Sequence, residues 1–185
     1  MATKTSQRVF IWVIAIVLTI GTIGTYAALV LGTSNQSSQA AEQQQLIEQY
    51  KQQIYDNNLP LDGYQAESFN AKSVDQLKVE DLKAGDGPVA KASDKLTVSY
   101  FGWTPDGKIF DSSNKKDGTG QPYSFTPSEG GVIAGWVKGL PGMKAGGVRL
   151  LSIPADQAYG STGSPPLIPA NTPLKFIVRL DKIGS

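Results

Sequence analysis

The chain has 185 residues and a formal net charge of +1, so it lacks the strongly basic character typical of nucleic-acid-binding proteins. It contains no cysteine and no histidine, which excludes disulfides, zinc sites made from these residues, thiol nucleophiles and Ser-His-Asp catalysis. No phosphate-binding glycine loop or calcium loop is present, and we expect neither a metal nor another cofactor.

A long apolar run near the N-terminus predicts a membrane anchor. Residues 9–31, VFIWVIAIVLTIGTIGTYAALVL, carry no charge and as a helix would span roughly 34 Å, enough for a hydrocarbon core of about 30 Å. Lys4 and Arg8 precede the run, and no Lys or Arg follows before Lys51, which predicts a cytoplasmic tail (1–8) and an extracytoplasmic remainder. A cleaved signal peptide, giving a secreted protein, is the alternative, although its apolar region is usually only about 7–15 residues long. We therefore expect a single-pass protein of the cell membrane.

The next segment, residues 32–75, is expected to be a polar linker. A helical pattern covers about residues 40–57, with four apolar positions on one face: Leu46, Ile47, Tyr50 and Ile54. Asn57, Asn58 and Pro60 are expected to end this helix. It is too short for a full coiled coil, so a spacer helix and a short pairing helix both remain open. Residues 59–75 show no clear period, which predicts a solvated segment.

From residue 76 to residue 185, glycine and proline separate short apolar runs, a pattern typical of antiparallel sheet. Strands are predicted at 78–82, 95–103, 108–111, 122–126, 148–153 and 174–183, and the only helical segment is 131–140. The 95–103 segment alternates as a half-buried strand would. The sequence therefore predicts an α+β domain with five to six antiparallel strands and one short α-helix.

Four stretches of this domain resemble the FKBP-type peptidyl-prolyl cis-trans isomerases. They are VSYFGWTPDGKIFDSS at 98–113, VIAGWVKGLPGMKAGGVRLLSIP at 132–154, AYG at 158–160 and LIPANTPLKFIVRL at 167–180. Each stretch alone is short, but their order and spacing together are specific. The resemblance implies an antiparallel sheet curled around the short helix.

The resemblance also implies a set of site residues. Tyr100, Asp111 and Tyr159 are expected to act on the peptide, and the substrate-binding residues are expected to be Phe110, Tyr123, Val132, Ile133, Trp136, Ile168 and Phe176. Tyr123 stands where the family usually has phenylalanine, and the 114–121 segment is a few residues longer than usual. Lys115 and Lys116 are both candidates for the family's basic residue near Asp111. The alternative for Asp111 is a plain turn cap with Ser112 and Ser113, and the functional interpretation is favoured.

The resemblance implies an enzyme that speeds rotation about X-Pro bonds by non-covalent, metal-free binding of proline in an apolar pocket. The expected partners are proline-containing polypeptides outside the cytoplasm and macrolide inhibitors. The alternative is a chaperone-like or scaffold module that uses the same groove with little turnover.

Overall fold

The computed structural model describes residues 36–129 and 131–184. The predicted cytoplasmic tail (1–8) and anchor (9–31) lie outside the described residues. Within 36–129 and 131–184, no helix is both long and apolar enough to cross a membrane. The chain divides into two compact units, one ending at Gln49 and one starting at Tyr50.

Helix α2 (Gln36–Asn57) is the predicted connector helix. It ends where Asn57 and Asn58 were expected to end it, but it begins at Gln36 rather than near residue 40. The extra turn, QSSQ at 36–39, is polar and so leaves no apolar period in the sequence. Leu46 is 57% exposed, as suits a mainly polar helix.

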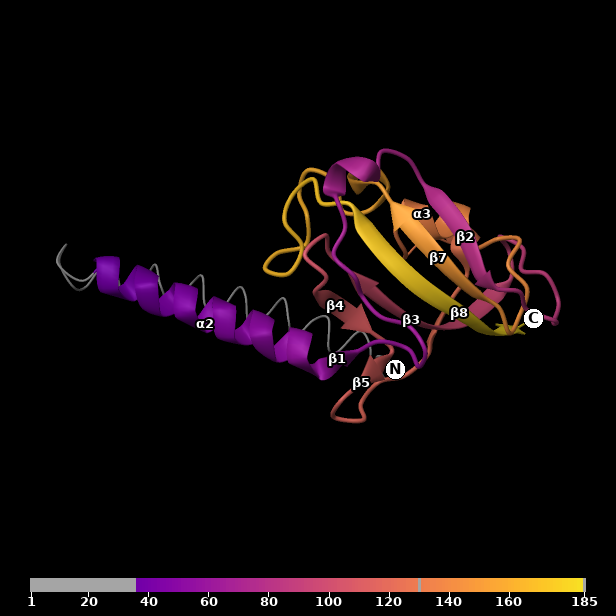
Figure 1. Cartoon of the computed structure of the whole chain (residues 1–185), viewed down its shortest axis with the longest axis horizontal. Coiled ribbons are helices and arrows are strands. Elements are labelled where there is room, and N and C mark those ends of the chain that lie inside the picture. Colours follow the sequence, from indigo (N-terminus) through magenta and orange to yellow (C-terminus); the bar gives the residue numbers. More distant parts are fainter. Residues whose placement is uncertain (1–35, 130, 185) are drawn as a thin grey trace. The chain divides into compact units, whose positions relative to one another are not determined.

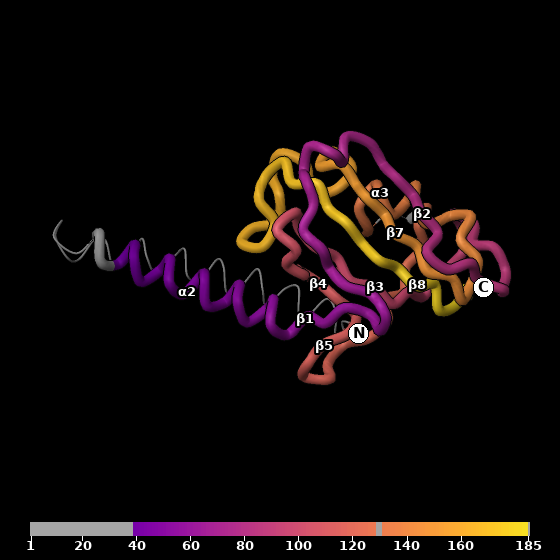
Figure 2. Tube along the Cα trace, in the orientation of Figure 1, coloured from indigo at the N-terminus to yellow at the C-terminus, as the bar shows by residue number. Residues whose placement is uncertain are grey.

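The domain contains one six-stranded antiparallel sheet and one two-stranded sheet (Figures 1 and 2). The large sheet has the order β2-β7-β8-β3-β4, and β6 also pairs with β3. Its strands are β2 (Lys78–Lys83), β3 (Lys95–Trp103), β4 (Ile109–Ser112), β6 (Tyr123–Phe125), β7 (Val148–Ile153) and β8 (Leu174–Gly184). The small sheet pairs β1 (Asn58–Leu59) with β5 (Asn114–Lys115). The predicted antiparallel sheet with one short domain helix, α3 (Ala134–Gly139), is confirmed.

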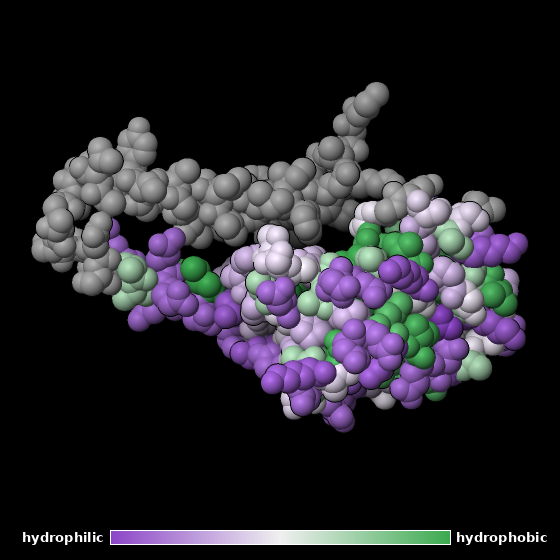
Figure 3. Space-filling model, turned by 90° about the horizontal axis from the view of Figure 1, so that it is seen from above, coloured by the Kyte–Doolittle hydropathy of each residue, from purple (hydrophilic) through white to green (hydrophobic). Residues whose placement is uncertain are grey.

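The central strand β3 is buried on both faces, which corrects the prediction of a half-buried strand. Leu96 and Val98 belong to one hydrophobic cluster, here called the inner cluster, together with residues of β7 and α3. Phe101 and Trp103, at the alternate positions, belong to a second cluster, here called the outer cluster. On the face seen in Figure 3, apolar side chains form a few patches between hydrophilic ones.

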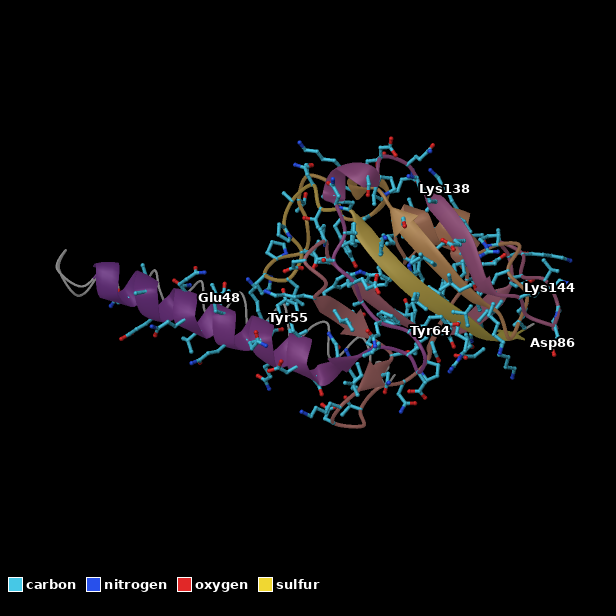
Figure 4. All side chains as sticks on the ribbon, viewed as in Figure 1. Glu48, Tyr55, Tyr64, Asp86, Lys138 and Lys144 are labelled. Atoms are coloured by element: carbon cyan, nitrogen blue, oxygen red, sulfur yellow. The ribbon has the colours of Figure 1, made fainter. Side chains whose placement is uncertain are left out.

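The outer cluster is covered by the segment that we expected to be a solvated linker. Leu61 is 6% exposed and packs with Phe101 and Trp103, and Tyr64, labelled in Figure 4, packs against the same cluster. The Trp103 indole Nε1 donates a hydrogen bond to the Glu67 carbonyl oxygen (2.9 Å). The domain boundary expected at residue 76 is therefore too late. This irregular segment buries isolated apolar side chains, and it shows no period because it forms neither helix nor strand over most of its length.

Replacing Leu61 by alanine is expected to lower the free energy of unfolding by about 2–4 kcal/mol, because a buried leucine loses its packing and leaves a cavity. Urea denaturation of the full-length chain measures the change. Leu46→Ala is the matched control, since Leu46 is 57% exposed, and its effect should stay within about 0.5 kcal/mol. Equal effects of the two substitutions would contradict the buried position of Leu61.

Candidate active site

Helix α3 positions Trp136 through two glycines that let the helix lie close to the sheet. A Cβ atom on Gly135 would lie 2.4 Å from Cγ2 of Ile153, and one on Gly139 would lie 2.8 Å from Cδ2 of Leu151. Arg149 fixes the other end of the helix, because its Nη1 donates to the Gly139 carbonyl oxygen (2.7 Å). The close approach leaves Trp136 only 4% exposed, against the inner face of the sheet.

Trp136 is the centre of a group of rings, here called the aromatic cluster: Tyr100, Phe110, Tyr123, Phe125, Trp136 and Phe176. The Trp136 ring meets Tyr100 edge to face at 5.1 Å and Phe176 at 5.3 Å, and it lies tilted against Phe125 at 5.5 Å. Phe110 meets Phe176 edge to face at 5.6 Å. Such edge-to-face pairs are favourable ring geometries. The arrangement packs several rings at fixed angles around Trp136.

The Trp136 indole N–H has no hydrogen-bond partner, and within the described part of the chain it is the one buried side-chain polar atom in this state. A buried donor without a partner costs about 1–3 kcal/mol. An unpaired buried polar group in a folded protein needs an explanation, and a role in the function of a site is one such explanation. The unpaired donor therefore marks the aromatic cluster as a candidate ligand site.

Asp111 closes one side of the aromatic cluster. The Tyr100 hydroxyl donates to Oδ2 of Asp111 at 2.5 Å, and the Ser112 backbone N–H donates to Oδ1 at 2.8 Å. Lys115, rather than Lys116, supplies the basic group, with its Nζ 3.1 Å from Oδ1 of Asp111. The carboxylate thus binds the Ser112 backbone within β4 as well as the Tyr100 hydroxyl of the cluster.

The remaining site residues surround this group. Ile168 is 3% exposed and belongs to the inner cluster, and Val132 and Ile133 pack against it, half-buried. Tyr159 is 39% exposed, and the charge of Asp111 contributes, after burial, to raising the pKa of its hydroxyl. Eight of the ten expected residues thus belong to the inner cluster or pack against it, Asp111 is joined to it through Tyr100, and Tyr159 is near enough for the charge of Asp111 to act on its hydroxyl. Among the described residues, no group of three or more Asp or Glu side chains could hold a metal ion.

Gly102 is a site residue that sequence reasoning missed. It lies in β3 on the same face as Tyr100, and a Cβ atom there would lie 2.4 Å from Cε1 of Phe176 and 2.8 Å from Cζ of Phe110. Only glycine leaves room for the two rings. The signal was present, because an isolated glycine inside a strand pattern indicates the close approach of another group.

Raising the pH is expected to destabilise the fold through Tyr100. Burial, and then the negative charge of Asp111, raises the pKa of its hydroxyl well above the usual 10.0. The folded state therefore holds the Tyr100 proton more tightly than the unfolded chain does. The stabilisation that the protonated Tyr100 hydroxyl gives the fold is full below about pH 10 and is lost as the pH rises towards the folded pKa. Urea denaturation between about pH 9 and pH 11 should show the free energy of unfolding falling less steeply for Tyr100→Phe than for the native chain. Identical slopes would contradict the raised pKa.

Comparison with known proteins identifies the family. The model of the FKBP-type peptidyl-prolyl cis-trans isomerases matches residues 87–181. The chain is 46% identical over 104 residues to "FK506-binding protein 4" of Rhizopus delemar, covering 56% of this chain and 26% of that protein. It is also 46% identical over 104 residues to the protein of the same name from Dictyostelium discoideum, covering 56% and 27%. The chain thus spans about a quarter of the length of these curated relatives.

Solved structures agree with the family model. The crystal structure of AtFKBP13 has a TM-score of 0.53 and 34% identity, covering 58% of this chain and 93% of that one. The peptidyl-prolyl cis-trans isomerase of Pseudomonas syringae pv. tomato has a TM-score of 0.52 and 30% identity, covering 83% of this chain and all of that one. With its antiparallel sheet, its docked helix and the family match over residues 87–181, the chain belongs to the FKBP-type peptidyl-prolyl cis-trans isomerase family.

Proposed function

We propose that this protein accelerates cis-trans rotation of X-Pro bonds in client polypeptides and that the aromatic cluster binds the proline ring. The observation that carries the proposal is the gathering of Tyr100, Phe110 and Phe176 around the buried Trp136, with Asp111 beside them. Trp136 forms the floor under the proline ring. Val132, Ile133 and Ile168 complete the apolar walls, and Tyr123 lies at the edge of the cluster, stacked on Phe125 at 5.5 Å.

The chemistry fits an apolar site. Amide resonance sets a barrier of about 18–20 kcal/mol to rotation, and uncatalysed exchange at proline takes tens of seconds or longer. Twisting the amide breaks the resonance and lowers its charge separation, so a water-poor apolar pocket stabilises the twisted form more than the planar form. No nucleophile, metal or other cofactor takes part in this step.

Polar groups orient the peptide in the proposed complex. The Ile133 backbone N–H and the Tyr159 hydroxyl bind substrate carbonyl oxygens, and Asp111 faces the rotating carbonyl carbon. A tyrosine hydroxyl is protonated at neutral pH, and the raised pKa of Tyr159 is consistent with this, so the hydroxyl is available as a donor. FK506-type macrolides, which give the curated relatives their name, are proposed as inhibitors that occupy the same cluster.

The clients are proposed to lie outside the cytoplasm. Residues 9–31 are apolar and uncharged, and the basic residues Lys4 and Arg8 precede them, so a helix with its N-terminus in the cytoplasm would carry the domain to the other side. Residues 9–31 lie outside the described structure. Alkaline extraction of membranes tests the anchor: the native chain should stay in the pellet, and recovery of the native chain in the supernatant would contradict membrane insertion.

The isomerase activity is tested by exchange of a short X-Pro peptide catalysed by the full-length chain. The native protein should speed exchange, and Asp111→Asn, which keeps the side-chain shape but removes its charge, should lower kcat/KM about tenfold, or about 1.4 kcal/mol. Asp86→Asn is the matched control, because Asp86 is exposed on the turn that follows β2 (Figure 4). A folded native chain that binds the peptide without speeding exchange would support the alternative of a binding module.

A further inference from the structure

The segment that joins helix α2 to the domain is hydrogen-bonded to residues 112–116, which directly follow Asp111 in the chain. Strand β1 pairs with β5 in the register Asn58 to Lys115 and Leu59 to Asn114. Further hydrogen bonds join Ser112 Oγ to the Leu59 carbonyl (2.6 Å), Asn114 Nδ2 to the Pro60 carbonyl (2.9 Å), and the Lys116 N–H to the Asn57 carbonyl (2.8 Å). The 112–116 loop is thus held by residues N-terminal to the part that the family model matches, 87–181.

Asn58 is the member of this segment that reaches towards the site. It is 4% exposed, and both ends of its side-chain amide are used. Its Nδ2 donates to the Ile109 carbonyl oxygen (2.9 Å), and its Oδ1 accepts a hydrogen bond from Nζ of Lys115. These partners fix the orientation of the amide, because only its NH₂ end can face a carbonyl and only its oxygen can face an ammonium group.

Lys115 carries the connection to Asp111. Its Nζ lies 3.1 Å from Oδ1 of Asp111, and the Lys115 side chain is 23% exposed. A lysine ammonium sits on a flexible stem with rotatable donors, so a single carboxylate partner does not fix its position. The oxygen of Asn58 is a second acceptor, and the two acceptors together confine Nζ. Since Asp111 also accepts from Tyr100, the bonds run from Asn58 through Lys115 and Asp111 into the aromatic cluster.

We propose that Asn58 is a positioning residue of the isomerase site, which holds Lys115 against Asp111 and so orients the Asp111 carboxylate towards the substrate amide. This inference rests on the proposed function, in which Asp111 faces the rotating carbonyl. Asn58 itself touches no substrate. Asn58 affects only the fraction of time that Asp111 spends in the orientation required for catalysis. The loss of Asn58 should therefore change kcat more than it changes KM.

The test is a double-mutant cycle in the full-length chain, with kcat and KM measured on an X-Pro peptide. Asn58→Ala and Lys115→Met should each lower kcat about fivefold with KM little changed, as expected for a misplaced catalytic group. The double variant should be no slower than either single one, because both changes break the same connection. Asn57→Ala is the matched control: the Asn57 side chain donates to Asp117, the residue after the 112–116 loop (3.0 Å), and its loss should leave kcat at the native value.

The possible outcomes separate a positioning role from a structural one. Unchanged kcat for Asn58→Ala would overturn the inference. Losses of kcat that multiply in the double variant would overturn it too, because an asparagine with only a structural role would lower the melting temperature and act independently of Lys115. If Asn58→Ala does not fold, Lys115→Met decides alone, and native kcat for that variant would overturn the inference. A folded but inactive native chain would overturn the proposed function and this inference together, whereas an active native chain with an unaffected Asn58→Ala variant would overturn the inference alone.

Discussion

Gly102→Ala is expected to remove most of the isomerase activity while leaving the chain folded at low temperature. The new methyl group would lie 2.4 Å from Cε1 of Phe176 and 2.8 Å from Cζ of Phe110, so both rings must move away from their present edge-to-face contact. Overpacking of this kind costs about 1–3 kcal/mol of stability. The displaced rings are walls of the proposed proline site, and a shift of about 1 Å there can lower kcat/KM about a hundredfold.

Gly184→Ala is the matched control for this prediction. Gly184 is also a strand glycine of the large sheet, but the nearest atom to its added Cβ would be the Lys95 carbonyl oxygen at 3.6 Å, an ordinary contact. Its alanine variant should keep native activity and native stability within about 0.5 kcal/mol. Peptide exchange and urea denaturation of the two variants are measured side by side. Native activity in Gly102→Ala would show that Phe110 and Phe176 do not form the proline site.

Trp136→Leu is expected to lower kcat/KM more than a hundredfold, because the floor of the aromatic cluster and its contacts with Tyr100 and Phe176 are lost. The variant should also lose about 3 kcal/mol of stability, since a large buried side chain is replaced by a smaller one. Activity is therefore measured at a temperature where denaturation curves show the variant to be folded. Leucine keeps the site apolar, so the loss reports the shape of the floor rather than the entry of water.

Trp103→Leu separates the effect on the site from the effect on stability. Trp103 and Trp136 are both 4% exposed, but Trp103 belongs to the outer cluster on the opposite face of the sheet, stacked on Phe101 at 5.2 Å. The Trp103 variant should lose comparable stability and retain native kcat/KM. An equal loss of activity in the two variants would mean that Trp136 acts only through the fold.

The sequence predicted the regular parts of the domain closely. Strands β3 and β7 begin and end at the predicted residues, because their apolar runs are long and are followed closely by proline, at Pro105 and Pro154. The short helix was expected over 131–140 and extends only over Ala134–Gly139, since the flanking residues form turns. β1 and β5 have two residues each, which is too short for any periodic pattern, and their pairing depends on a contact between distant segments.

The candidate site came from the resemblance rather than from periodicity. Pattern alone treats Phe110 and Phe176 as ordinary core residues, and their edge-to-face contact appears only once β4 and β8 lie on either side of β3. The choice between Lys115 and Lys116 likewise needed the conformation of the 112–117 loop. Leu61 was missed because its burial depends on an irregular segment crossing the sheet, which local sequence does not encode.

The short length of α3 links the strength of ligand binding to the integrity of the fold. Six residues do not form a stable helix in isolation, so α3 exists only while Gly135 and Gly139 are seated on β7 and Arg149 holds its last turn. Any local opening that lifts α3 from the sheet also removes Trp136 from the aromatic cluster. A bound proline or macrolide would therefore slow amide hydrogen exchange in α3 and β7 together, and loss of that docking would appear as weaker binding before it appeared as global unfolding.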